Sequence, residues 1–424
     1  MFRSLAQERS ESSGRNWFRP RRFLSSASSL TTLEKKSVDP PTVPARPNRV
    51  LLIAHAFSPE RNRRQLSELG TGVELRVLAP RSFQETWGSA APPEPVNYEW
   101  KEFGILQFVP HQYLALSATL GMREFDPDVI HVDYPAWSLV YWQCLLFRTI
   151  FARHAKIVCA AKKNTFRAPR GVRGALKTFV SRLGTRAADH IEASSRLSES
   201  MLESALGVSS DEISVIPHMG VDTEIFNPAT RSGNPNDPII VGYCGKYSEH
   251  KGLMVLLEAA QKVRASGVDL ELRLVGSGPM NDYLNSFASQ NSWLDVGPES
   301  SSTGVAEFMR GLDIYVLPAL ICPDHQEHDG HALIQALASG VASIGTDSGV
   351  IPDILGDGAG ILVPSGDPDT LANAIWTLAA DEDLRSSYAD ASLKLVSERY
   401  TLEAVAEARR LMYGSLADQS STPV

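Results

Sequence analysis

The residues best suited to chemistry in this sequence surround the junction of a polar loop and an apolar helix, at Glu327, Gly330 and Gln335. The loop follows a predicted buried strand at 313–317, so the junction lies at the carboxyl end of a strand, where open parallel sheets bind ligands. The helix predicted at 331–339 presents free N–H groups and its positive dipole end there, and Gly330 lets the backbone approach a ligand closely. These features predict a binding site for an anion such as a phosphate.

Two lysines, Lys246 and Lys251, follow a second predicted strand at 239–243. One lies just beyond the strand and the other begins a helix, so both ammonium groups can reach one diphosphate and neutralise it. A reaction that releases a diphosphate needs this stabilisation of the leaving group. Taken alone, two lysines indicate only a solvated surface, so the diphosphate role depends on the motifs around them.

A third strand, predicted at 270–275, is followed by a turn that contains Gly276 and Gly278. A Gly-x-Gly turn on its own suggests a dinucleotide site. Here the third glycine of that fingerprint is missing, and the unit is not the first of its domain. The turn alone therefore does not identify a nucleotide site, and its interpretation depends on the neighbouring motifs.

In the N-terminal half, His131 and Asp133 lie at the end of a strand predicted at 129–132. An imidazole or a carboxylate at this point could contact a reacting hydroxyl, and either could relay a proton. For His131, a core position within the strand is an equally weighted alternative. Asp133 is the better candidate because it lies beyond the strand.

The stretch 322–357 resembles the family 4 retaining glycosyltransferases. Their signature is a Glu, seven residues and a second Glu, followed by a small-residue helix and then a strand and loop of the form GVPVIGTDxGGxPE. Glu327 holds the first position, whereas Gln335 replaces the second Glu and Asp353 replaces the last one. The match runs in order over about thirty residues, so it is much more specific than two side chains at a fixed spacing.

Other elements resemble the same family and occur in its order. The segment 217–228 matches P-x-GVD-x-x-x-F-x-P, and the segment 245–252 resembles the phosphate element GR-x-x-x-x-KG, with Lys246 in the Arg position. The turn VGSGP matches VGxGP, and 128–138 is similar to a motif that ends in His-x-His, with Asp133 in place of the second His. One departure is the loop HAFSPERNRR after the opening strand, where the family usually has a Gly-rich loop.

The resemblance covers residues 48 to about 415 and implies an α/β fold of the GT-B type, with two Rossmann-like doubly wound domains facing a central cleft. It implies an acceptor domain at 48–235 and a nucleotide-sugar domain at 236–400. A helix within 401–424 would return to the first domain. Alternating strand-like and helix-like stretches independently indicate parallel βα units.

The implied activity is transfer of a hexosyl or related unit from a nucleotide sugar to an acceptor hydroxyl, with retention of anomeric configuration. The acceptor could be a glycan, a polysaccharide, a lipid or a small molecule. Neither a metal nor a cofactor is expected, since helix dipoles and lysines can replace a cation at the diphosphate. The competing hypothesis is a catalytically inactive protein of the same fold that binds a nucleotide sugar or acts as a scaffold.

The resemblance also implies a role for individual residues. The catalytic residues would be Glu327, Asp133 and His131. The donor diphosphate would contact Lys246, Lys251, Gly330, His331 and Ala332. The nucleotide would contact Gln335, Gly276, Gly278 and Val296. The transferred sugar would contact Glu327, His328 and Asp329.

Composition sets limits on the class of protein. A chain of 424 residues with 43% hydrophobic and 21% charged residues predicts a soluble globular protein of two domains. Its net charge of −8 argues against nucleic acid as a partner. Four cysteines without metal-ligand spacing indicate buried thiols in a reducing compartment.

Three segments outside the motifs carry further predictions, two about localisation and one about the linker between the domains. Residues 1–47 hold nine Lys or Arg against four Asp or Glu and are rich in Ser, which indicates either an organelle transit peptide or a disordered tail. Residues 229–238 form a predicted hinge linker. The apolar run 136–152 predicts a buried or membrane-touching helix and not a span. The expected location is cytoplasmic or peripheral on the cytoplasmic face of a membrane, with organelle import as the alternative.

Overall fold

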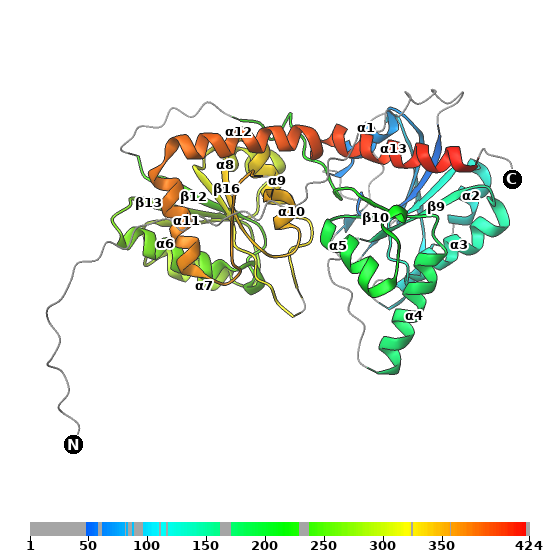
Figure 1. The fold of residues 1–424 in the computed structure, drawn as a ribbon, viewed down its shortest axis with the longest axis horizontal. Helices are drawn as coiled ribbons and strands as arrows, with labels where there is room; N and C mark the ends of the chain where they lie inside the picture. The colour runs from blue at the N-terminus through cyan, green and yellow to red at the C-terminus, as the bar shows by residue number, and fades with distance from the viewer. Residues whose placement is uncertain are drawn as a thin grey trace, which may run out of the picture. The chain divides into compact units, whose positions relative to one another are not determined.

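Two parallel sheets flanked by helices form the core of this chain, as the alternation of strand-like and helix-like stretches predicts (Figure 1). The computed structural model describes residues 48–57, 62–80, 82–83, 87–88, 96–109, 112–115, 118–161, 171–228, 237–323, 325–356 and 358–420. Both sheets belong to one compact unit of the chain. The segment 1–47 and most of the predicted linker, including the predicted domain boundary at 235, lie outside the described residues.

The first sheet contains seven strands that pair in parallel. In spatial order they are β11 (Ile213–Val215), β10 (His190–Ala193), β9 (Lys156–Ala161), β8 (Val129–Val132), β1 (Arg49–Ile53), β2 (Glu74–Pro80) and β5 (Glu99–Phe103). The strand order reverses at the neighbours β1 and β8, where doubly wound sheets leave a crevice. Both strands are buried on their two faces, which explains their continuous apolar sequences.

At one edge of this sheet, short antiparallel strands interrupt the alternation of strands and helices. The stretch 105–109 is a strand, β6 (Ile105–Val109), but it pairs antiparallel with β7 (Gln112–Ala115) in a separate sheet. The edge position belongs to β5, whose sequence EWKEF lacks an apolar run because the strand is mostly half-buried. Another small sheet pairs β3 (Ser82–Phe83) with β4 (Trp87–Gly88).

Helices α1 (Arg64–Gly70), α2 (Ala118–Phe125), α3 (Leu139–Phe151), α4 (Val172–Arg186) and α5 (Arg196–Met201) accompany the first sheet, with a π-helix at Leu202–Leu206 and a 3-10 turn at Ser210–Glu212. Helix α1 begins at Arg64, and residues 58–61 before it lie outside the described residues. The run 136–152 forms α3, which buries four residues against the protein. Among the described residues, no helix is both long and apolar enough to cross a membrane.

The second sheet contains six parallel strands. Their spatial order is β14 (Leu294–Gly297), β13 (Leu270–Val275), β12 (Ile239–Cys244), β15 (Ile314–Leu317), β16 (Ala342–Thr346) and β17 (Ile361–Val363). The helices of this half are α6 (Leu253–Ala265), α7 (Asn281–Ala288), α8 (Ser302–Arg310), α9 (His331–Ala338), α10 (Ile351–Leu355), α11 (Pro368–Ala380) and α12 (Glu382–Arg399), with a 3-10 turn at Glu249–Lys251. The order reverses at β12 and β15, which places a second crevice there.

The last helix, α13 (Leu402–Ser420), packs on the first sheet, as the resemblance implies. Val405 and Tyr413 share a buried cluster with Val50 of β1 and Leu66 of α1. Arg410 also donates a hydrogen bond of 2.6 Å to a backbone carbonyl of α1. The last helix therefore completes the core of the first half of the chain, the part before residue 229 that contains the first sheet (Figure 1).

The four cysteines are free thiols. Cys144 and Cys159 are buried, as predicted, and burial raises the pKa of both thiols. Cys244 and Cys322 are only half-buried, because Cys244 ends a strand and Cys322 lies in a loop. Burial raises the pKa of Cys244 to about 11.

Candidate active site

Two loops meet where the order of the second sheet reverses. One follows β12 and contains Lys246 and Lys251, and the other follows β15 and contains Glu327. Gly252 ends the first loop with φ of 73°, and a side chain there would come within 1.8 Å of the Pro318 carbonyl oxygen. The two loops are therefore in backbone contact, which a residue with a side chain would prevent.

Lys251 and Glu327 form an ion pair between these loops, with 2.6 Å from Nζ to Oε2. The two side chains are only 17% and 9% exposed. The N–H of Glu327 donates to Ser348 Oγ, and the Glu327 carbonyl accepts from the Val350 N–H. These contacts hold the carboxylate in a defined position beside the first turn of α9.

Glu327 remains ionised although it is buried. Burial alone raises the pKa of a carboxyl group, but the charge and hydrogen bond of Lys251, together with the amide of Gly330, hold the pKa of Glu327 below its ordinary value. The sequence predicts both lysines at one diphosphate. In the structure, Lys251 is paired with this carboxylate, whereas Lys246 is exposed.

Histidines adjoin the ion pair. The ring centroid of His325 lies 3.9 Å from that of His250 and 5.3 Å from that of His328. Burial, followed by the charges of His250 and Lys251, lowers the pKa of His325 to about 4. This imidazole is therefore neutral at pH 7 and adds no charge beside the Lys251–Glu327 pair.

A cavity of about 920 Å³ brings five of the predicted contacts together. They are Lys246, Gly276, Gly278, His331 and Gln335. This volume lies within the range of about 300 to 1,000 Å³ that is usual for pockets that bind small molecules. The loop after β12, the turn after β13 and the first turns of α9 therefore border one space that can hold a ligand.

The two glycines of the VGSGP turn let it pack against the loop after β12. A side chain on Gly276 would come within 1.9 Å of the Gly245 carbonyl oxygen, and one on Gly278 within 2.4 Å of the Tyr247 carbonyl oxygen. The Tyr247 hydroxyl in turn donates to the carbonyl of Gly297 at the end of β14. Three strand ends are thus held close together at the wall of the cavity.

Four other predicted diphosphate and nucleotide contacts, Lys251, Gly330, Ala332 and Val296, do not line this cavity, and neither does Glu327. Gly330 has φ of 57°, and a side chain there would meet Ile354 at 2.4 Å, so its lack of a side chain serves the packing against α10. Ala332 and Val296 are partly buried and pack on the core of the second half.

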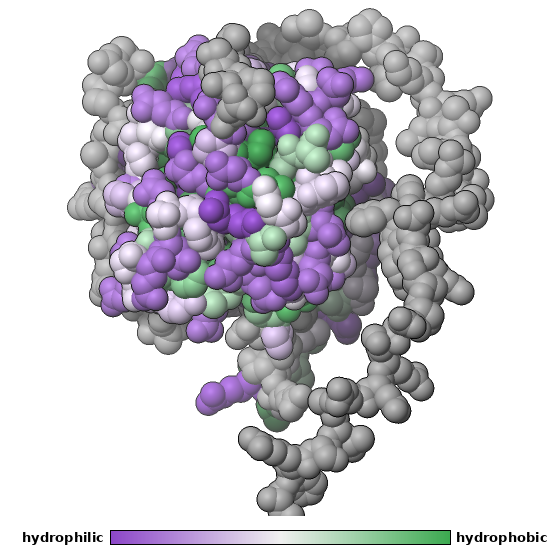
Figure 2. Space-filling model, turned by 90° about the vertical axis from the view of Figure 1, so that its left-hand side faces the viewer, coloured by the Kyte–Doolittle hydropathy of each residue, from purple (hydrophilic) through white to green (hydrophobic). Residues whose placement is uncertain are grey.

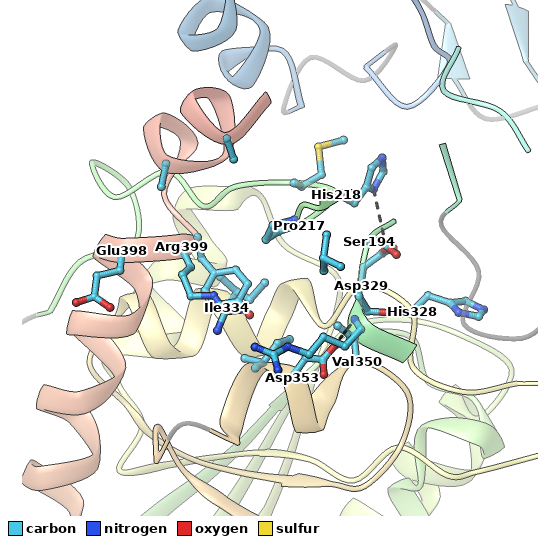
Figure 3. Close-up of a pocket in the computed structure, with 18 residues that line it drawn as sticks. Ser194, Pro217, His218, His328, Asp329, Ile334, Val350, Asp353, Glu398 and Arg399 are labelled. Atoms are coloured by element: carbon cyan, nitrogen blue, oxygen red, sulfur yellow. Dashed lines mark hydrogen bonds and ion pairs between the residues drawn. The ribbon is translucent and has the colours of Figure 1, made fainter. Parts of the chain in front are cut away.

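A smaller cavity of about 160 Å³ is lined by two residues predicted to contact the transferred sugar, His328 and Asp329 (Figure 3). His218 Nδ1 lies 3.9 Å from Asp329 Oδ1. Asp353, which replaces the last Glu of the signature, accepts a hydrogen bond of 2.7 Å from the Arg196 N–H at the start of α5. His328 and Asp329 thus border a different cavity from the predicted nucleotide contacts.

His131 and Asp133 lie among the residues covered by α13. His131 is 2% exposed, and its Nδ1 lies 2.7 Å from the Tyr413 hydroxyl. Asp133 is also buried, and its N–H donates to the Ile53 carbonyl. Neither residue lines the two cavities described above. In this structure His131 therefore occupies a buried position within β8.

Some residues of the large cavity carry no family motif. Arg64 begins α1 and forms ion pairs with Asp222 and Glu224, and Arg64 and Asp222 both line the cavity. Ser277 donates a hydrogen bond of 3.3 Å to Glu299, which also lines it. The arginine cluster RNRR could have drawn attention to Arg64. Glu299 has no comparable signal in the sequence.

Solved structures define the class of fold. Sucrose-phosphate synthase from Thermosynechococcus elongatus matches with a TM-score of 0.67 at 19% identity, over 87% of this chain and 99% of that one. HepE from Anabaena, in complex with UDP, matches with a TM-score of 0.65 at 14% identity, over 87% and 100%. Together with the two doubly wound sheets, these likenesses show a GT-B fold.

Family models and relatives then give the family. The model described as Glycosyltransferase Family 4 matches residues 50–225, and the model described as Glycosyl transferases group 1 matches residues 227–394. The chain belongs to the group 1 glycosyl transferases of family 4, which confirms the resemblance seen in its motifs.

Curated relatives match over most of their length. The phosphatidyl-myo-inositol mannosyltransferase of Mycolicibacterium smegmatis is 28% identical over 336 residues, which are 76% of this chain and 81% of that protein. The protein of the same name from Mycobacterium leprae is 28% identical over 84% of this chain and 92% of its own length.

Proposed function

We propose that this protein transfers a hexosyl unit from a nucleoside diphosphate sugar to an acceptor hydroxyl, with retention of anomeric configuration and without a bound metal. Its membership of a glycosyltransferase family supports sugar transfer. The UDP bound to HepE supports a nucleotide donor. The observation that carries the proposal is the buried Lys251–Glu327 pair, held at a strand-order reversal where the loop after β12 and the start of α9 also border a ligand-sized cavity.

Each polar group of this region has a proposed role. The exposed ammonium of Lys246 contacts the diphosphate from the cavity wall. Gln335 accepts a hydrogen bond from a ribose hydroxyl, as a carboxamide can. The ionised carboxylate of Glu327 accepts hydrogen bonds from hydroxyls of the transferred sugar, and Lys251 keeps that carboxylate charged and in place. His331 contributes to the wall at the start of α9.

In the proposed reaction, the bond between the anomeric carbon and the diphosphate oxygen breaks, and a bond to the acceptor oxygen forms on the same face. The acceptor proton passes to the departing diphosphate. Lys246 and the positive end of α9 stabilise the negative charge that develops on the leaving group. Glu327 is already paired with Lys251 and is not assigned the role of a nucleophile.

The names of the relatives indicate the first donor and acceptor to test. Two are phosphatidyl-myo-inositol mannosyltransferases, so a mannosyl donor and phosphatidyl-myo-inositol come first. The decisive experiment supplies a panel of UDP-, GDP- and ADP-sugars with and without acceptor and measures release of free nucleoside diphosphate. The anomeric configuration of the product is read by NMR.

The panel also tests the competing hypothesis of a catalytically inactive binding protein. We expect turnover with one donor, strongly reduced in the Lys246→Ala variant. Lys394→Ala, on α12 and away from the lining of the cavity, is the matched control. Tight binding of a nucleotide sugar without turnover under any condition would contradict the proposed transfer, and an inverted product would contradict retention.

A further inference from the structure

Helix α4 presents its large apolar side chains to solvent. Val172, Leu176, Phe179 and Leu183 are 86%, 60%, 64% and 46% exposed. Their spacing of four, three and four residues places them on one face of the helix. Scattered apolar residues are normal on a protein surface, but a continuous exposed row is typical of an interaction site.

The face of α4 that packs against the protein carries small and hydroxyl-bearing residues. Gly174, Ser181, Gly184 and Thr185 are the buried residues of this helix. A side chain on Gly184 would come within 2.3 Å of the Ala136 carbonyl oxygen, so the contact is close. The usual distribution in a surface helix, apolar inside and polar outside, is therefore reversed. The apolar row is therefore not needed for the packing of α4 against the rest of the first half.

Positive charge flanks this row on both sides. Arg173 and Lys177 each follow a residue of the row by one position, Arg182 precedes one, and Arg186 lies three positions after the last. The surrounding stretch 134–188 contains eleven Lys or Arg and no Asp or Glu. The whole chain carries a net charge of −8, so the remainder carries −19. Helix α4 itself carries four cations and no acid, whereas Arg148 and Lys156 elsewhere in the stretch pair with Asp189 just beyond it.

The exposed surface of α4 differs in its hydropathy from the face of the molecule seen in Figure 2. In Figure 1 the first turns of α4 extend away from the strands of the first sheet. Figure 2 views the molecule from the left-hand side of Figure 1, where hydrophilic residues separate small apolar patches. That face has the ordinary appearance of a protein surface in water.

We propose that α4 is a docking surface for an anionic phospholipid bilayer. The four apolar side chains enter the headgroup region, and the exposed Arg173 and Arg186 contact lipid phosphates. Lys177 lies over the ring of Trp137 and Arg182 donates to the Ala205 carbonyl, so these two add positive charge beside the row. A lipid surface fits because it offers apolar depth and a layer of negative charge together, which the row and its flanking cations match. The inference does not depend on the proposed sugar transfer, but it would place the enzyme beside an acceptor carried by a lipid.

The test is flotation of the full-length protein with vesicles. One set contains phosphatidylcholine alone, and the other contains about 30% phosphatidylglycerol to give the surface a negative potential. We expect binding to the anionic vesicles that weakens as salt is raised. Arg173→Gln with Arg186→Gln should weaken the partition constant about 30-fold, since each cation near such a surface contributes about fivefold. Leu176→Gln with Phe179→Gln should weaken it about 100-fold.

A matched control separates docking from general surface change. Leu411 of α13 is 60% exposed, like Leu176, so Leu411→Gln should leave vesicle binding unchanged. Circular dichroism checks that each variant is folded. Failure of the wild type to bind anionic vesicles, or unchanged binding by both α4 variants, would overturn the proposal. So would an α4-dependent dimer, seen by ultracentrifugation, that does not bind lipid, because the row would then be a protein interface.

Discussion

At the scale of single residues, Glu327 shows how a buried charge is retained. Its carboxylate is 9% exposed, yet Lys251 at 2.6 Å and the amide of Gly330 favour the ionised form. The family signature predicts an acid at this position. The structure adds that the acid belongs to an ion pair, so substitutions must be designed with its partner in mind.

Glu327→Gln should lower kcat/KM by about 2 kcal/mol or more, because an amide is a weaker acceptor for sugar hydroxyls than a carboxylate. Nucleoside diphosphate should bind at least as well as before, because Lys251 keeps its charge. Steady-state kinetics and calorimetry measure the two effects. Equal losses in turnover and in nucleotide affinity would contradict the assignment of Glu327 to the sugar.

Gln335→Glu should leave activity intact or improve it. Gln335 lines the large cavity, and a charged acceptor makes a stronger hydrogen bond to a ribose hydroxyl than a carboxamide does. The comparison is nucleoside diphosphate affinity in the wild type, Gln335→Glu and Gln335→Ala. If Gln335→Glu is folded but inactive, the site is built around a neutral group and the ribose role is wrong.

His325 should make stability depend on pH. Burial and nearby cations lower its pKa from 6.5 to about 4, so between these values the unfolded chain binds a proton that the folded chain does not. Stability should therefore fall as the pH falls from 6.5 toward 4. Glu327 acts in the same direction below about pH 4.5, because its lowered pKa contributes stability that protonation removes.

The check is the change in Tm between pH 7 and pH 5 for the wild type and His325→Asn. The variant should lose less stability over this interval. His154→Asn, at a half-exposed histidine of the first half, is the control and should follow the wild type. Identical pH profiles for all three proteins would show that His325 is not the titrating group.

At the scale of elements, the site depends on loops that only the strand order brings together. The loop after β12 and the loop after β15 are distant in sequence, and they meet because these strands are neighbours in the second sheet. The ion pair connects the two loops, and Gly252 allows their backbones to touch. The site is therefore coupled to the stability of the second half.

Lys251→Met should lower the free energy of unfolding by about 3 kcal/mol or more, because it leaves the Glu327 carboxylate buried without its cation. Adding Glu327→Leu should recover much of this loss, since two apolar groups replace the pair. Urea denaturation measures both effects. Lys246→Met, at an exposed lysine, should hardly change stability. A loss in the double variant equal to the sum of the single losses would argue against a coupled pair.

At the scale of the whole molecule, α13 ties the end of the chain to its first half. Arg409 of α13 donates to both carboxylate oxygens of Glu192 on β10, at 3.0 and 2.8 Å, and also to the His218 carbonyl. Both side chains of the ion pair are 4% exposed. Burial opposes the charge of Arg409, but Glu192 outweighs it and raises the pKa of the guanidinium.

Arg409→Met should destabilise the protein by about 3 to 5 kcal/mol, because it removes the cation from a buried carboxylate. Unfolding in urea, followed by fluorescence, gives the value. Lys394→Met, at an exposed residue of α12, provides a comparison outside this pair. A change below about 1 kcal/mol would show that the pair contributes no more than an exposed ion pair does.

Much of the fold could be predicted from the sequence, because apolar runs and helical spacing report local structure directly. The central strands β8 and β12 and the helix α9 lie where their patterns place them, within a residue or two at each end. The ordered motifs around Glu327 also established the family. These signals are local in the chain, so they need no knowledge of which segments become neighbours.

The tertiary structure decided what depends on distant partners. The Lys251–Glu327 pair and the burial of His131 under Tyr413 require strand order and the return of α13, which no local pattern contains. The edge strand β5 lacks an apolar run because only part of it is covered. For α4 the apolar spacing would predict a buried face, but small residues make the closer contact and the apolar row points outward. Periodicity tells which residues share a face, whereas packing decides which face is inside.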